Sequence, residues 1–78
     1  MKFELTKEFL EELRERIEND DDQGAFKMIE DLHPADIAEI YDELNIEEAR
    51  FLHIMLSGEK AADVLIELEQ DDRERFLE

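Results

Sequence analysis

The order of apolar and polar residues predicts a series of short amphipathic helices. The clearest runs from Pro34 to Leu44, because proline suits a first helical position, where its missing N–H would have no intrahelical partner. Its apolar residues follow at spacings of three, one and three, which places them on one stripe with acidic residues on the opposite face. The stripe comprises Ile37, Ile40, Tyr41 and Leu44, with Ala38 at its edge.

Two helices are expected before Pro34. Thr6 is a suitable cap for the first, which should end near Asn19 and bury Phe9, Leu10, Leu13 and Ile17. Asp20 is expected to cap the second, with Gln23 in the reciprocal position of a capping box. The apolar stripe of this second helix comprises Ala25, Phe26, Ile29 and Leu32.

Three further helices are expected after Leu44. Asn45 and Glu48 form the pattern of a capping box, which predicts a helix from Ile46 to Leu56. Phe51 and Ile54 give that helix a second apolar flank and therefore a second neighbour. The fifth helix follows Ser57-Gly58 and ends near Glu69, and the sixth is capped by Asp71 with Phe76 and Leu77 facing inward.

An internal repeat relates the later helices. An offset of 24 residues aligns Ala38, Ile40, Tyr41, Glu43, Leu44 and Leu52 with Ala62, Val64, Leu65, Glu67, Leu68 and Phe76. A helix-turn-helix unit repeated at a fixed period stacks into an array, because no unit buries its own stripe alone. We therefore expect an all-α superhelical array of helix-turn-helix repeats, with no strands because no segment alternates with period two.

Length and composition limit the class of protein. With 78 residues, the chain is expected to form a single helical domain over residues 1–78, and its sixth helix is so short that we expect a fragment of a longer domain. No cysteine is present, which favours an intracellular setting. No apolar run is long enough for a membrane span, so we expect a soluble fragment that does not insert into a membrane.

Acidic residues dominate the charge. The 25 Asp and Glu against 9 Lys and Arg give a formal net charge of −16, which repels phosphate backbones and argues against nucleic acid as a partner. The same surplus repels itself in the folded state, so cations should stabilise the domain by screening or by binding to carboxylates.

Few residues suggest other chemistry. His33 and His53 lie on different predicted helices, and a zinc site made from them would need carboxylates brought close by chance. The many carboxylates face the surface by pattern, whereas general acid catalysis needs a buried carboxyl with a raised pKa. We therefore expect no enzymatic activity.

The sequence resembles the N-terminal cytosolic domain of MgtE-type magnesium transporters from about residue 7 to the last residue. The resemblance rests on His33-Pro34-Ala35-Asp36-Ile37-Ala38-Glu39, on Asp42-Glu43-Leu44 and on Lys60-Ala61-Ala62-Asp63-Val64-Leu65. It implies a magnesium-sensing regulatory domain on the cytoplasmic side of the bacterial inner membrane. In such transporters the domain precedes two CBS domains and a transmembrane pore, the whole protein is a homodimer, and Mg²⁺ held between acidic surfaces keeps the pore closed.

One ligand follows from the resemblance. The acidic residue after the Lys-Ala-Ala triplet contacts Mg²⁺ in the family pattern, and Asp63 holds that place here, one methylene shorter than the common glutamate. Glu59 and Glu67 lie one helical turn before and after it, so their spacing alone makes them further candidates. The remaining ligands would come from elsewhere in the transporter, so we expect the isolated chain to bind Mg²⁺ weakly.

A second interpretation is a protein-interaction scaffold. The flagellar motor switch protein FliG has similar short-helix repeats, with a His-Pro opening and Ala-Ala-x-Val-Leu runs. The Ala-Asp-Ile-Ala-Glu sequence after His33-Pro34 fits the transporter domain better.

Overall fold

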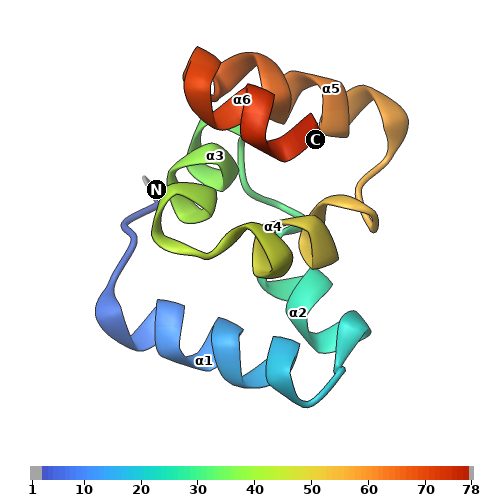
Figure 1. Cartoon of the computed structure of the whole chain (residues 1–78). Helices are drawn as coiled ribbons and strands as arrows, with labels where there is room; N and C mark the ends of the chain where they lie inside the picture. The colour runs from blue at the N-terminus through green and yellow to red at the C-terminus, as the bar shows by residue number, and fades with distance from the viewer. Residues whose placement is uncertain (1–2, 78) are drawn as a thin grey trace.

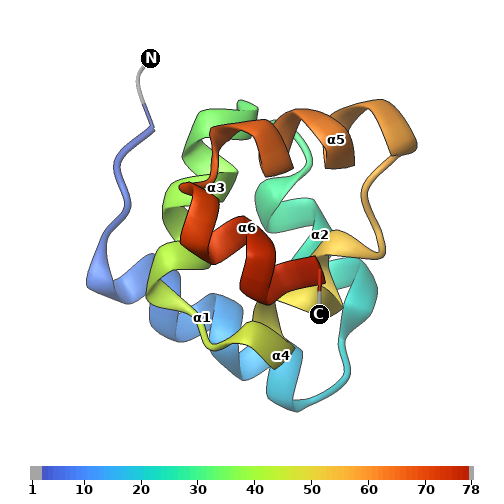
Figure 2. The same cartoon turned by 45° about the horizontal axis from the view of Figure 1, so that its top comes forward.

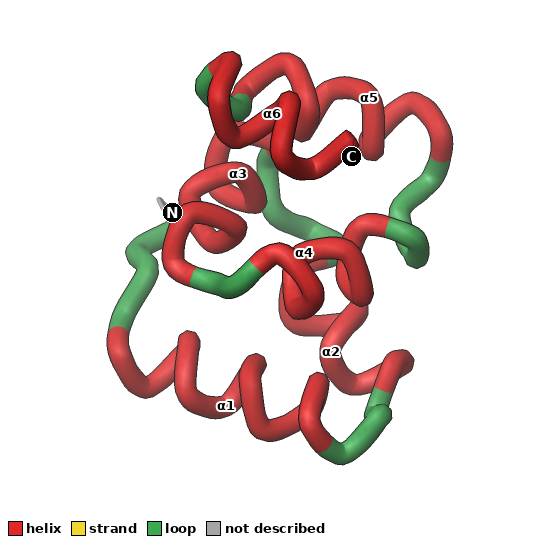
Figure 3. Tube along the Cα trace, in the orientation of Figure 1, coloured by secondary structure: helices red, strands yellow, loops and turns green. Residues whose placement is uncertain are grey.

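The computed structural model describes residues 3–77, which form six α-helices and no strand. The helices are joined by short turns (Figures 1 and 3). In chain order they are α1 (Lys7–Glu18), α2 (Asp22–Ile29), α3 (Pro34–Glu43), α4 (Ile46–His53), α5 (Gly58–Glu67) and α6 (Gln70–Leu77). The prediction of an all-α fold is confirmed.

The 24-residue repeat is visible in the helix boundaries. Adding 24 to the bounds of α3 gives those of α5, and adding 24 to the bounds of α4 gives those of α6. The same offset relates α2 to α4, although the sequence alignment above begins only at Ala38. The chain is therefore built from helix-turn-helix units in which α1–α2, α3–α4 and α5–α6 follow one another.

Equivalent helices of successive units lie against each other. α5 contacts α3, α4 contacts α2, and α6 contacts α4, while α1 packs on α2 and α4. Figure 1 shows α1 at one end of the stack and α5 at the other, and the turned view in Figure 2 shows α6 beside α3 and below α5. This stacking places the third unit at an outer end, with one side of α5 facing away from the rest.

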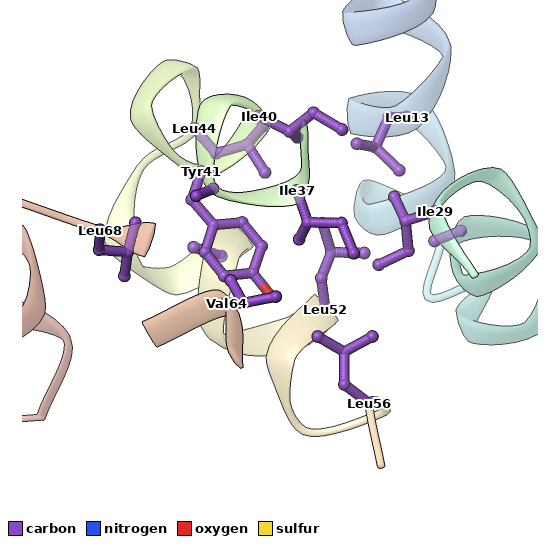
Figure 4. Close-up of a cluster of buried hydrophobic side chains, with 13 residues drawn as sticks. Leu13, Ile29, Ile37, Ile40, Tyr41, Leu44, Leu52, Leu56, Val64 and Leu68 are labelled. Carbon is purple, nitrogen blue, oxygen red and sulfur yellow. The ribbon is translucent and has the colours of Figure 1, made fainter. Parts of the chain in front are cut away.

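The core lies where the stripes of the six helices meet (Figure 4). Its most deeply buried members come from five different helices, so each helix depends on its neighbours for burial. The core residues are Leu13, Ala25, Ile29, Ile37, Ala38, Ile40, Tyr41, Leu44, Ala49, Leu52, Leu56, Val64 and Leu68. All five residues of the stripe predicted between Pro34 and Leu44 are among them.

Several predicted caps are confirmed. The Thr6 hydroxyl accepts the N–H of Phe9 at 3.1 Å, and the Ser57 hydroxyl caps α5. Asn45 and Glu48 form both hydrogen bonds of a capping box, at 2.8 and 3.0 Å. Each cap satisfies an N–H that would otherwise have no partner at the start of a helix.

The predicted cap of α2 was wrong by one residue. Asp20 lies in the left-handed region with φ of 56°, which extends the turn and makes Asp21 the cap. One carboxylate oxygen of Asp21 accepts the N–H of Gly24 at 3.1 Å, and the other accepts from Arg16 at 2.9 Å. A side chain at Gly24 would collide with Asp21 and Arg16, so glycine leaves room for this ion pair.

The predicted end of the fourth helix and its predicted second apolar flank were wrong. α4 ends at His53 rather than at Leu56, since the N–H groups of Met55 and Leu56 bond in a tighter turn to Leu52 and His53. Ile54 then points to solvent and is 81% exposed, so it does not form a second buried flank.

The sixth helix also begins two residues earlier than a cap at Asp71 predicts. α6 starts at Gln70, and the N–H of Arg73 bonds to the carbonyl of Glu69 at 2.9 Å. Asp71 therefore lies inside the first turn and is not the cap. Phe76 packs against the core as expected, whereas the predicted position of the Leu77 side chain lies outside the described residues.

Cationic side chains cap the ends of several helices from a neighbouring helix. Arg14 of α1 donates to the carbonyl of Glu43 at 2.7 Å, and Lys60 of α5 donates to the carbonyl of Glu30 after α2. Arg73 and Arg50 bond in the same way to the last carbonyls of α5 and α6. These bonds satisfy C-terminal carbonyls and place positive charge at the negative ends of helix dipoles.

Candidate functional site

Helix α5 carries the acidic residues that the sequence singled out. Glu59, Asp63 and Glu67 follow at intervals of four along α5, so they lie one above the other on the same side of the helix. All three are exposed, while Val64, in the apolar stripe of the same helix, is fully buried. The helix therefore presents a row of carboxylates to solvent because its apolar stripe is fixed against α3.

Asp63 and Glu59 also line an open hollow next to the turn that follows α2. Glu30, Asp31 and Lys60 line the same hollow, and the Lys60 ammonium bonds to the carbonyl of Glu30 there. The N-terminal ends of α3 and α5 border it and carry partial positive charge. The hollow thus combines positive charge from Lys60 and two helix ends with carboxylates that are exposed to solvent.

The carboxylates of Glu59, Asp63 and Glu67 could supply only some of the ligands of a magnesium site. Within residues 3–77, no group of three or more His, Cys, Asp or Glu side chains is placed to hold a metal ion together. Carboxylate oxygens are suitable ligands for Mg²⁺, which keeps several waters and needs only one or two carboxylates from a protein surface. Asp63 can therefore supply one oxygen ligand, and a complete set needs groups from outside this part of the chain.

A second acidic cluster joins α3 and α6, and the sequence did not indicate it. The Asp42 and Asp72 carboxyls lie close together and line the same small hollow, with Glu69 and Glu43 near them. Partial burial and then these neighbours raise the pKa of Asp42 above its ordinary value of 3.8, because both effects disfavour the ionised form. No spacing rule connects positions 42 and 72, which only the packing of α6 on the earlier helices brings together.

The two histidines have different surroundings. His53 Nδ1 lies 3.1 Å from the Tyr41 hydroxyl, and its ring meets the edge of Phe76 with centroids 4.7 Å apart. Burial lowers the pKa of His53, since the charged imidazolium would lose hydration. His33 is exposed just before α3 and does not use its side chain as a cap. The contacts of His53 are those of a packed aromatic group linking α3, α4 and α6.

The region that carries these features matches a known family. The family model of the MgtE intracellular N domain matches residues 32–78, which is more than half of the chain. The chain belongs to the MgtE intracellular N domain family. The match covers the two related units α3–α4 and α5–α6, including Asp63 and both members of the Asp42–Asp72 pair. No curated protein and no solved structure matches the chain significantly.

Membership in this family gives the general role. The MgtE domain is an intracellular part of a magnesium transporter, a family without enzymatic function. It supports the transporter interpretation of His33-Pro34 and the Lys60-Ala61-Ala62-Asp63 run over the flagellar alternative. In residues 3–77 of the MgtE domain, no helix has the length and apolar character needed to cross a membrane.

Proposed function

We propose that this MgtE domain is a regulatory magnesium sensor that closes the pore of its transporter when Mg²⁺ is abundant. The observation that carries the proposal is the excess of carboxylates on the surface of this chain, which belongs to the MgtE intracellular N domain family. The formal net charge is −16, and no charged residue among residues 3–77 is buried. Such a surface repels an acidic neighbour unless positive charge lies between them.

The proposed partners are two CBS domains and the transmembrane domain of the same polypeptide, in a homodimer at the bacterial inner membrane. This domain would lie on the cytoplasmic side. Bound Mg²⁺ would supply the positive charge that lets two acidic surfaces approach. The role of this chain would be to hold carboxylates at fixed positions on its surface. Helix α5 can do so because it packs against α3.

Asp63 is the residue proposed to contact Mg²⁺, with Glu59 and Glu67 as further candidates on the same side of α5. Support for Asp63 comes from its place after Lys60-Ala61-Ala62 and from its exposure to solvent beside the hollow that it lines. The Lys60 ammonium donates to the carbonyl of Glu30, which gives its charge a partner in the turn after α2. The row is then free to face another domain.

The test uses the cytosolic part of the parent transporter, with this domain in place. Raising MgCl₂ should increase its melting temperature and reduce its radius of gyration in small-angle scattering, beyond the effect of NaCl at the same ionic strength. The comparison matters because simple screening also stabilises a highly charged protein. Equal responses to the two salts would reject the sensor.

A pair of variants tests the residue assignment. Asp63→Ala should shift the magnesium midpoint to higher concentration, whereas Glu11→Ala, which removes an exposed carboxylate from α1 at the other end of the stack, should leave it unchanged. Both variants change the net charge equally, so a difference between them reports position rather than charge. An unchanged midpoint for Asp63→Ala would remove this residue from the site.

A further inference from the structure

Helix α6 is attached to the rest of the domain by few apolar contacts. None of residues 70–76 is fully buried, and Phe76 is the residue of this helix that packs against the core. Its ring stacks on Tyr41 of α3 with centroids 5.7 Å apart, and Arg50 of α4 donates to its carbonyl at 3.2 Å. A helix with so little buried surface opens locally more easily than a core helix, so a change of charge beside it can alter its docking.

The first turn of α6 brings a carboxylate close to one of α3. Asp72 of α6 and Asp42 of α3, here called the aspartate pair, line the same small hollow where α3, α4 and α6 meet. Asp72 is half-buried, and the rest of the lining is largely apolar. Ionised carboxylates repel each other more strongly at such a place than in open water, because less water screens their charges. Packing of α6 on α3 therefore opposes the ionisation of both members.

The charged groups around the aspartate pair do not neutralise it. Glu43 of α3 and Glu69 before α6 add negative charge beside the pair. Arg75 of α6 also lines the hollow, but among the described residues no ion pair joins it to either aspartate. The residues that α4 and the end of α5 contribute to the lining are apolar, and Tyr41 of α3 stays neutral because burial raises the pKa of its hydroxyl. Partial burial and then the neighbouring carboxyls raise the pKa of Asp42, so the folded domain holds a proton there more tightly than the unfolded chain does.

We propose that the aspartate pair is a proton-operated latch, which docks α6 more tightly on α3 as the surroundings become more acidic. Binding of one proton from solvent removes one negative charge from the pair, and the protonated carboxyl can then donate a hydrogen bond to its ionised partner. The docked state holds this proton more tightly than the undocked state does. Docking therefore strengthens as pH falls from neutrality towards 3.8, the ordinary pKa of Asp42, and weakens again as pH rises. The latch uses no magnesium, so it does not depend on the proposed sensor function.

The test follows amide hydrogen exchange of the whole chain by NMR at about pH 7 and about pH 5, with EDTA present to remove divalent cations. Asp72→Asn replaces one member of the aspartate pair by a neutral side chain of the same shape. Asp71→Asn is the matched control, because Asp71 is an exposed carboxylate of the same turn that does not line the hollow, and its loss changes the net charge equally. His53, which contacts Phe76, has its ordinary pKa in this range, so each variant is compared with the parent chain, which has the same histidine.

The latch makes a specific pattern of exchange rates the expected result. After correction for intrinsic exchange, the gain in protection of α6 amides on acidification should be roughly twofold larger in the parent than in Asp72→Asn. Asp42→Asn, which removes the other member of the pair, should behave like Asp72→Asn, whereas Asp71→Asn should respond like the parent. The amides of α2 should differ less between parent and variant, because no residue of α2 lines the hollow. The proposal is overturned if the parent and Asp72→Asn respond equally, if Asp71→Asn also loses the response, or if α2 changes as much as α6.

Discussion

Arg73 offers a sharp test of how helix ends are stabilised in this fold. Its Nε donates to the carbonyl of Leu65 at 3.0 Å, and its Nη2 donates to the carbonyls of Ile66 and Leu68 at 3.3 Å each. These carbonyls lie at the end of α5, where the regular hydrogen bonds of the helix run out, and the Leu65 carbonyl accepts in addition only the N–H of Leu68 in a tighter turn at 3.2 Å. Replacing Arg73 with methionine keeps an apolar stem of similar reach but removes all three donors.

The expected loss can be worked from these contacts. A hydrogen bond from a charged donor contributes about 1.5 to 3 kcal/mol when its partner is shielded from water. The bonds to Leu65 and Leu68 are partly buried and the bond to Ile66 is exposed, and the two longer bonds, to Ile66 and Leu68, share a single nitrogen. Water can replace part of them, so we expect Arg73→Met to lower the free energy of unfolding by about 2 kcal/mol. For a domain of this size that corresponds to a fall in melting temperature of roughly 8 to 16 °C.

Urea and thermal unfolding followed by circular dichroism provide the measurement. Lys27→Met is the matched control, because Lys27 is an exposed cation in the last turn of α2 and its removal changes the net charge equally. We expect that control to change stability by less than about 0.5 kcal/mol. If Arg73→Met were no more destabilising than Lys27→Met, the hydrogen bonds to the end of α5 would contribute nothing and the reasoning would be wrong.

Two further predictions concern titrating groups. Because the folded state raises the pKa of Asp42, its ionised form opposes folding at neutral pH, so Asp42→Asn should stabilise the domain by about 0.5 kcal/mol at pH 7 and low salt. In urea titrations this gain should vanish below about the ordinary pKa of 3.8, and a variant less stable than the parent at pH 7 would contradict it. Because burial lowers the pKa of His53, its contribution to stability is present above the ordinary pKa of 6.5 and is lost as pH falls through the lowered value. The stability difference between the parent and His53→Gln should therefore shrink on acidification below pH 6.5, and a constant difference would refute the argument.

Local patterns in the sequence were enough to predict most of the helices. Pro34 and the Asn45–Glu48 box mark helix starts that depend on neighbouring residues alone. The stripe from Ile37 to Leu44 is read directly from its spacing, because burial in a helix repeats every three or four residues. The error at Asp20 was a shift of one residue between adjacent aspartates that are equally good caps. At the sixth helix the shift was two residues, since α6 begins at Gln70.

Asp63 could be singled out from the sequence only through the family pattern, and the structure adds that it is exposed on a fixed helix. No pattern in the sequence indicated that Asp42 lies close to Asp72 or that Lys60 bonds to the turn after α2. These pairs are some 30 residues apart, and their contact depends on how whole helices stack.

By itself, the sequence determined the helix-turn-helix repeat, its acidic surface and the resemblance to the transporter domain, because spacing, charge and motif are properties of the chain. Only the tertiary structure decided which part of each stripe is covered. Ala38 and Ala62 occupy equivalent places in the repeat, yet one is buried and the other exposed. The reason is physical: burial depends on the neighbour that packs against a residue, and α3 has α5–α6 against it whereas the outer side of α5 has no such unit within residues 3–77.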